Sequence, residues 1–133
     1  MNTPKWIPLL FWLAALYDGI LGLAFLAAPG PLFDLCQVTP PNHLGYVQFP
    51  AALLLIFGLM FAVIARDPVG RRHLIVYGIL LKVAYCGVAG VHWAAGGIPG
   101  MWKPFVVIDL VMGLLFVAAC LSLAKVVARR DAA

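Results

Sequence analysis

Three ionisable residues lie inside long apolar stretches of this 133-residue sequence: Asp18, Lys82 and Asp109. A charge in the hydrocarbon core of a membrane costs about 2.5–3.5 kcal/mol on insertion. Such residues therefore pair with one another, face the protein interior or line a cavity. These three are the first candidates for a functional site.

The depth of each charge follows from a helical rise of about 1.5 Å per residue. Asp18 stands twelve residues after Trp6, about 18 Å into its stretch, and Lys82 stands nine residues after His73, about 14 Å into its own. Because the long lysine stem reaches further, we expect the Asp18 carboxylate and the Lys82 ammonium to meet. The contact would be direct or would pass through one water.

Asp109 approaches from the opposite membrane surface. It stands seven residues after Trp102, about 10 Å below that surface, with no basic residue three or four positions away. We expect Tyr85 and His92 to be its partners. Lys103, folding back from the start of the stretch, is the alternative partner.

Helical spacing places several of these residues on one face of the third apolar stretch. That face holds Gly78, Lys82, Tyr85, Ala89 and His92. The pattern predicts a polar pocket in the outer half of the protein, which binds a ligand or has a structural role. The expected lining residues are Asp18, Lys82, Tyr85, His92, Asp109 and Tyr17.

The alternative is an ion pair, with a hydrogen-bonded tyrosine, that fixes the helix register. A proton relay through Asp18 or Asp109 is a narrower form of the pocket hypothesis. Small residues point to close helix packing as well. Ala15, Gly19 and Gly22 cluster with Asp18 on the first stretch and predict a seam where a second helix approaches closely.

The other residue types that could bind a metal or catalyse a reaction match no recognisable metal site or catalytic motif. The three histidines and three cysteines match no metal-ligand spacing, so we expect no metal site. The sequence contains no nucleophile elbow, HExxH motif or phosphate-binding loop. We therefore assign no catalytic residue and favour a role other than catalysis.

The elements that position these residues are membrane spans. Hydrophobic residues make up 65% of the chain, charged residues 11%, and the mean hydropathy is +1.04. A chain of this composition has more apolar surface than a soluble core of this size can bury. Runs of about 20 residues predict helices over 6–28, 46–65, 73–93 and 102–127. We expect an all-α polytopic membrane protein, with residues 1–133 forming a single domain as an antiparallel four-helix bundle.

The longest connector, residues 29–45, carries four prolines and two glycines. These exclude a long helix, although Leu32, Phe33, Leu35 and Val38 predict one short turn at the membrane surface. Basic residues set the expected orientation. They gather near the N-terminus, in the 66–72 turn and at the C-terminal end, whereas the 29–45 connector has none. We expect both termini to be cytoplasmic.

Three segments resemble the DoxX-like group of small four-helix bacterial membrane proteins. They are LYDGILGLAFLAAPGPLFDL (16–35), ARDP (65–68) and WKPFVVIDLVMGLLF (102–116). The resemblance implies a place in the bacterial inner membrane, as an accessory subunit near quinone-linked oxidoreductases. The sequence departs from many such proteins by carrying Asp18 where a basic residue is expected. No catalytic residue is implied.

The leading functional hypothesis is a non-catalytic protein that anchors a membrane complex or holds a lipophilic ligand such as a quinone. Its expected partners are the lipid bilayer and either other membrane subunits or further copies of itself, with no nucleic acid. A proton- or cation-coupled small permease, working as an oligomer, is the second hypothesis. An enzyme acting on a lipophilic substrate is the third.

Overall fold

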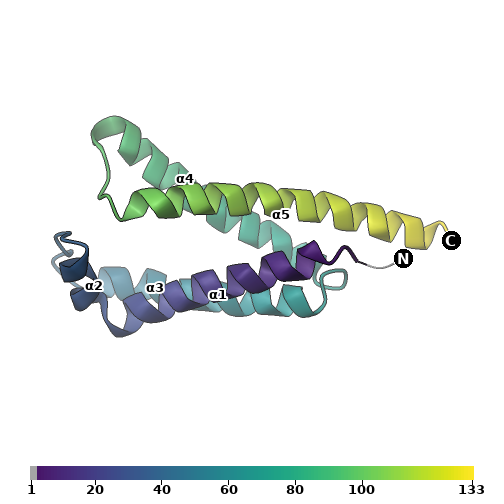
Figure 1. Ribbon diagram of the computed structural model, residues 1–133, viewed down its shortest axis with the longest axis horizontal. Coiled ribbons are helices and arrows are strands. Elements are labelled where there is room, and N and C mark those ends of the chain that lie inside the picture. The colour runs from purple at the N-terminus through teal and green to yellow at the C-terminus, as the bar shows by residue number, and fades with distance from the viewer. Residues whose placement is uncertain (1–2) are drawn as a thin grey trace. The chain divides into compact units, whose positions relative to one another are not determined.

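The computed structural model describes residues 3–133, and every regular element in that range is helical. Four helices are long and apolar enough to cross a membrane. They are α1 (Trp6–Ala27), α3 (Gly45–Arg66), α4 (Ile75–Gly96) with its preceding 3₁₀ turn η1 (Arg72–Leu74), and α5 (Trp102–Asp131) (Figure 1). The all-α class and the four predicted spans are confirmed.

The helix ends differ from the ends of the apolar runs. α4 continues to Gly96, three residues past the predicted end, and α5 continues to Asp131, four residues past it. Hydropathy marks the part of a helix that suits lipid, whereas backbone hydrogen bonds decide where the helix stops. At the end of α4 the stop is Gly97, whose φ of 90° suits glycine and whose N–H donates to the carbonyls of His92 and Trp93.

The connector after α1 contains the short helix α2 (Pro29–Leu35). The backbone breaks at Ala28, and Pro29 opens α2, where its missing N–H has no helical partner to lose. Phe33 is buried, and its ring lies 6.1 Å from that of Phe25 in an edge-on contact. The predicted short turn is confirmed within the connector, although Val38 lies beyond its end.

The chain divides into two compact units. One is Phe11–Ala62, which holds most of α1, all of α2 and most of α3. The other combines the residues up to Leu10 with Val63–Ala133, which include α4 and α5. The single domain over 1–133 stays a prediction.

Within the Phe11–Ala62 unit, glycines bring α1 and α3 into close contact. A Cβ atom on Gly22 would lie 2.6 Å from the Ala51 carbonyl oxygen, and one on Gly58 would lie 2.9 Å from the Gly19 nitrogen. Side chains at these points would force the backbones apart. The close-approach seam predicted on the first stretch is thus confirmed.

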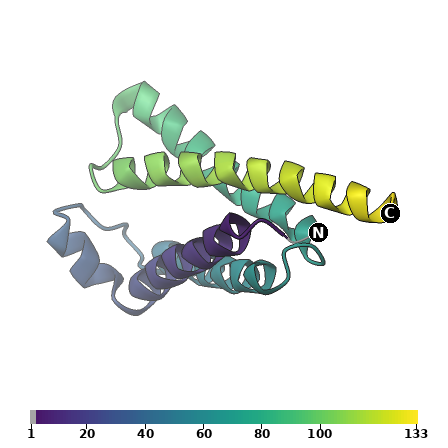
Figure 2. The ribbon, with the colours of Figure 1, turned by 45° about the vertical axis from the view of Figure 1, so that its right-hand side comes forward.

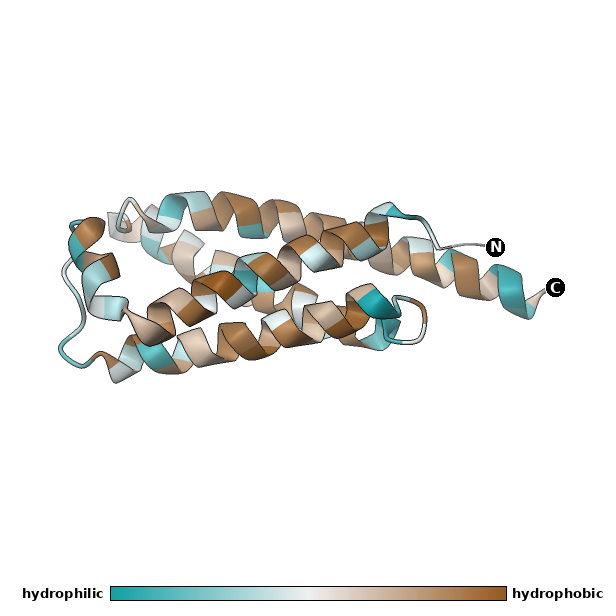
Figure 3. Ribbon diagram, turned by 60° about the horizontal axis from the view of Figure 1, so that its bottom comes forward, coloured by the Kyte–Doolittle hydropathy of each residue, from teal (hydrophilic) through white to brown (hydrophobic). Residues whose placement is uncertain are grey.

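Within the other unit, α4 and α5 form an antiparallel hairpin joined by residues 97–101 (Figures 1 and 2). The predicted face of α4 is its inner face, since Gly78, Lys82 and Ala89 are buried and Tyr85 is half-buried. Hydrophobic residues extend along the helices, and hydrophilic ones concentrate at helix ends and connectors (Figure 3). Many large apolar side chains are exposed, as lipid contact requires.

Candidate functional site

A buried ion pair joins α4 to α5. The Lys82 ammonium Nζ donates to Asp109 Oδ1 at 3.0 Å. The Lys82 side chain is 1% exposed and the Asp109 side chain 10%. Each charge therefore has an opposite charge in a setting of low dielectric, where an isolated one would be costly.

Gly113 makes room for the lysine stem. It stands one helical turn after Asp109 on the same face of α5. A Cβ atom at this position would lie 3.3 Å from Lys82 Cβ, which is tighter than ordinary contact. The glycine thus lets the stem lie across α5 and carry the ammonium to the carboxylate.

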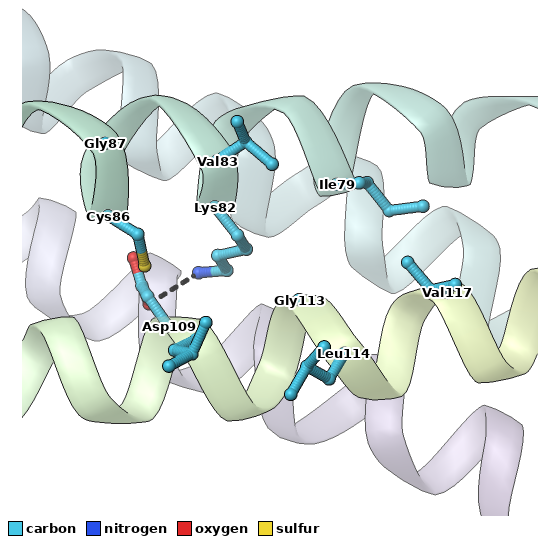
Figure 4. A pocket seen from close by; sticks show the side chains of 10 residues that line it. Ile79, Lys82, Val83, Cys86, Gly87, Asp109, Gly113, Leu114 and Val117 are labelled. Carbon is cyan, nitrogen blue, oxygen red and sulfur yellow. Dashed lines mark hydrogen bonds and ion pairs between the residues drawn. The ribbon is translucent and has the colours of Figure 1, made fainter.

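The pair lies in a groove of about 380 Å³ between α4 and α5 (Figure 4). Apart from the two charges, the groove is lined by apolar residues, two glycines and a thiol. These lining residues are Ile79, Val83, Cys86, Gly87, Leu110, Gly113, Leu114 and Val117. Val83, Leu110, Leu114 and Val117 are exposed, so the groove opens on the outer surface of the hairpin.

The two ends of the groove differ in polarity. Because the helices are antiparallel, Gly87 lies near Asp109 at one end, and Ile79 lies near Val117 at the other (Figure 4). Eight residues on each helix separate the ends, a length of about 12 Å. The Lys82 side chain points toward the Asp109 end (Figure 4). The groove thus has a polar end and an apolar end.

Further contacts fix the hairpin near the 97–101 loop. The Tyr85 hydroxyl donates to the Trp102 carbonyl oxygen at 3.3 Å, and the two rings lie 6.4 Å apart. Beside them, the Cys86 thiol donates to the Val106 carbonyl at 3.6 Å. At the loop itself, the Lys103 ammonium lies 5.5 Å from the centre of the Trp93 ring.

The partner of Asp109 differs from the one expected. Its carboxylate accepts from Lys82, whereas Tyr85 donates to a backbone carbonyl and His92 is exposed. The residues from Val91 to Gly97 are all exposed. The face of α4 that is buried at Lys82 is therefore exposed at His92, ten residues further along the helix. Lys103 contacts Trp93 instead of folding back to Asp109.

Two expected pocket residues belong to the other unit. Asp18 on α1 is 1% exposed, and its neighbour Tyr17 is half-buried. The expected contact between Asp18 and Lys82 stays a prediction, as does a pocket that includes all six expected residues. Within residues 3–133, no three His, Cys, Asp or Glu side chains come together as a metal site would require.

The apolar walls of the groove were not predicted from the sequence. The wall residues recur every three or four positions, as residues along one stripe of a helix do. They are Ile79 and Val83 on α4, and Leu110, Leu114 and Val117 on α5. In helices that are apolar on all sides, such a stripe carries no distinguishing signal. Gly113 did carry a signal, because it is a small residue one helical turn from the buried Asp109.

Comparisons with protein-family models, with curated proteins and with solved structures found no match to this chain.

Proposed function

We propose that this small multi-pass membrane protein holds a lipophilic molecule in the groove between α4 and α5. The observation that carries the proposal is the ion pair of Lys82 and Asp109 at the polar end of an otherwise apolar groove. A lipophile with a polar head matches both ends. The role we propose is binding, with no bond made or broken by the protein.

The open groove favours this proposal over a purely structural role for the pair. Apolar residues of similar volume often replace a buried ion pair without loss of stability. A register-fixing pair also needs no adjoining groove. At about 380 Å³, the groove falls within the range of about 300–1,000 Å³ usual for small-molecule sites.

The DoxX-like resemblance adds a setting to the proposal. It suggests an accessory subunit of a bacterial inner-membrane complex, with a quinone as one possible class of lipophile. The binding site proposed here faces outward from the hairpin, where a membrane-dissolved molecule or a neighbouring subunit has access. The hairpin also supports the proposed orientation. The 66–72 turn and the end of α5 lie at the same end of it, and each carries three basic residues.

Mass spectrometry of the natively purified protein tests the proposal. We expect a lipophile to be retained by the wild-type chain and lost in Leu114→Trp, whose larger ring fills the groove. Leu121→Trp is the matched control. Leu121 lies on the same helix with similar exposure, 61% against 64%, but outside the groove. Equal retention by both variants would exclude the groove as the site.

A further inference from the structure

We infer that the groove selects an uncharged lipophile whose head carries a hydrogen-bond donor, such as the hydroxyl of a long-chain alcohol, phenol or sterol. The inference rests on the proposed function. It adds the chemistry of the head group and its direction in the groove.

Asp109 is the more accessible of the two charged side chains that line the groove. The Asp109 side chain is 10% exposed, whereas that of Lys82 is 1% exposed. Oδ1 of Asp109 accepts from Lys82, and a carboxylate has acceptor capacity on both oxygens. An ionised carboxylate can only accept, so a head group that meets it must donate. A head with acceptors alone, such as an ether or an ester, would face the carboxylate without a hydrogen bond.

The charge of the pair sets the charge of the head. Lys82 and Asp109 carry opposite charges, so each already has a counter-charge. A carboxylate or ammonium head would bring a further charge to a site of low dielectric, which is unfavourable. A hydroxyl adds none, and its bond to an ionised acceptor is stronger than one between neutral groups.

The shape of the groove sets the direction of the occupant. A head at Asp109 leaves about 12 Å of apolar wall toward Ile79 and Val117 for the tail (Figure 4). The Cys86 thiol lines the polar end, but it donates to the Val106 carbonyl and leaves the carboxylate to the occupant. A quinone meets these requirements only in its reduced, dihydroxy form.

Photo-labelling of the full chain in phosphatidylcholine nanodiscs tests the inference. The probes are three twelve-carbon chains with a diazirine at the tail and an alcohol, a methyl ether or a carboxylate at the head. Peptide mass spectrometry measures labelling of residues 79–87 and 110–117. We expect the alcohol to label these segments at least about tenfold more than the ether, because a hydrogen bond to a charged group contributes more than one between neutral groups. Unlabelled 1-dodecanol should compete with it.

Two variants separate this inference from the proposed function. Lys82→Met combined with Asp109→Leu should abolish the preference for the alcohol while labelling persists, and Leu114→Trp should abolish labelling by every probe. If the wild type labels equally with alcohol and ether, and Leu114→Trp blocks both, the groove binds lipophiles but the donor requirement is wrong. If Leu114→Trp and Leu121→Trp label as the wild type does, the proposed function fails as well.

Discussion

The Lys82 ammonium on α4 and the Asp109 carboxylate on α5 lie 3.0 Å apart, and both side chains are nine-tenths buried or more. The two residues are 27 positions apart in sequence and belong to consecutive helices. Because the hydrocarbon region offers no water to replace either partner, we expect the pair to couple the stability of one helix to that of the other. The same pair forms the polar end of the groove between α4 and α5.

A double-mutant cycle should detect this coupling. Lys82→Met leaves the Asp109 carboxylate without its ion-pair partner, which should cost about 3–5 kcal/mol of unfolding free energy. Adding Asp109→Leu should restore part of that loss, because the remaining contact is apolar. Unfolding by sodium dodecyl sulfate in mixed micelles measures each variant. Additive single and double effects would show that the pair contributes no coupling.

The glycines between α1 and α3 give a second stability test. Gly22→Ala would place a methyl group 2.6 Å from the Ala51 carbonyl oxygen, so the backbones must separate, at a cost of about 1–3 kcal/mol. Gly19→Ala is the matched control on the same helix, since a Cβ atom there meets nothing within 4 Å. The control should leave stability unchanged or raise it, because alanine favours a helix. Equal losses in both variants would contradict the close contact at Gly22.

Sequence patterns predicted the spans well because membrane thickness fixes their length and lipid fixes their composition. They predicted the buried face of α4 for a similar reason, since Lys82 stays hidden only on an inward side. His92 shows where this fails. Helical spacing gives the direction in which a side chain points, but it does not show whether another helix covers that part of the chain.

Lys82 was not predicted as the partner of Asp109, because an estimated depth gives a side chain's position along the membrane normal only. The estimates placed the Asp18 and Asp109 carboxylates within a few ångströms of the same level, and Lys82 reaches that level. Depth alone gave no reason to bring Lys82 to Asp109 as well. Connectivity could have supplied one, since helices joined by a short loop usually pack together, and only residues 97–101 separate α4 from α5. The apolar residues of the groove walls follow no pattern that distinguishes them from the other apolar residues of α4 and α5.

The Tyr85 hydroxyl should contribute modestly to stability. Tyr85→Phe removes its donation to the Trp102 carbonyl oxygen but keeps the ring contact, and the expected cost is about 0.5–1.5 kcal/mol. Tyr77→Phe is the control, because Tyr77 is on the same helix and 57% exposed. Detergent unfolding compares the two. A cost at Tyr85 no larger than that at Tyr77 would exclude a stabilising hydrogen bond.

Cysteine labelling should establish the orientation of the chain. Cys36 is exposed just beyond α2, in a connector without basic residues, and serves as a native probe of the outer side. After Cys86→Ala and Cys120→Ala remove the other thiols, we expect a membrane-impermeant maleimide to label Cys36 in intact cells. With Cys36→Ser as well, His73→Cys and Ala132→Cys should react only after the membrane is opened. His73 and Ala132 are exposed beside Arg71, Arg72, Arg129 and Arg130, and basic loops stay in the cytoplasm. Labelling of His73→Cys in intact cells would reverse the proposed orientation. It would place the Asp109 end of the groove nearer the cytoplasm, while leaving the ion pair and the groove as they are.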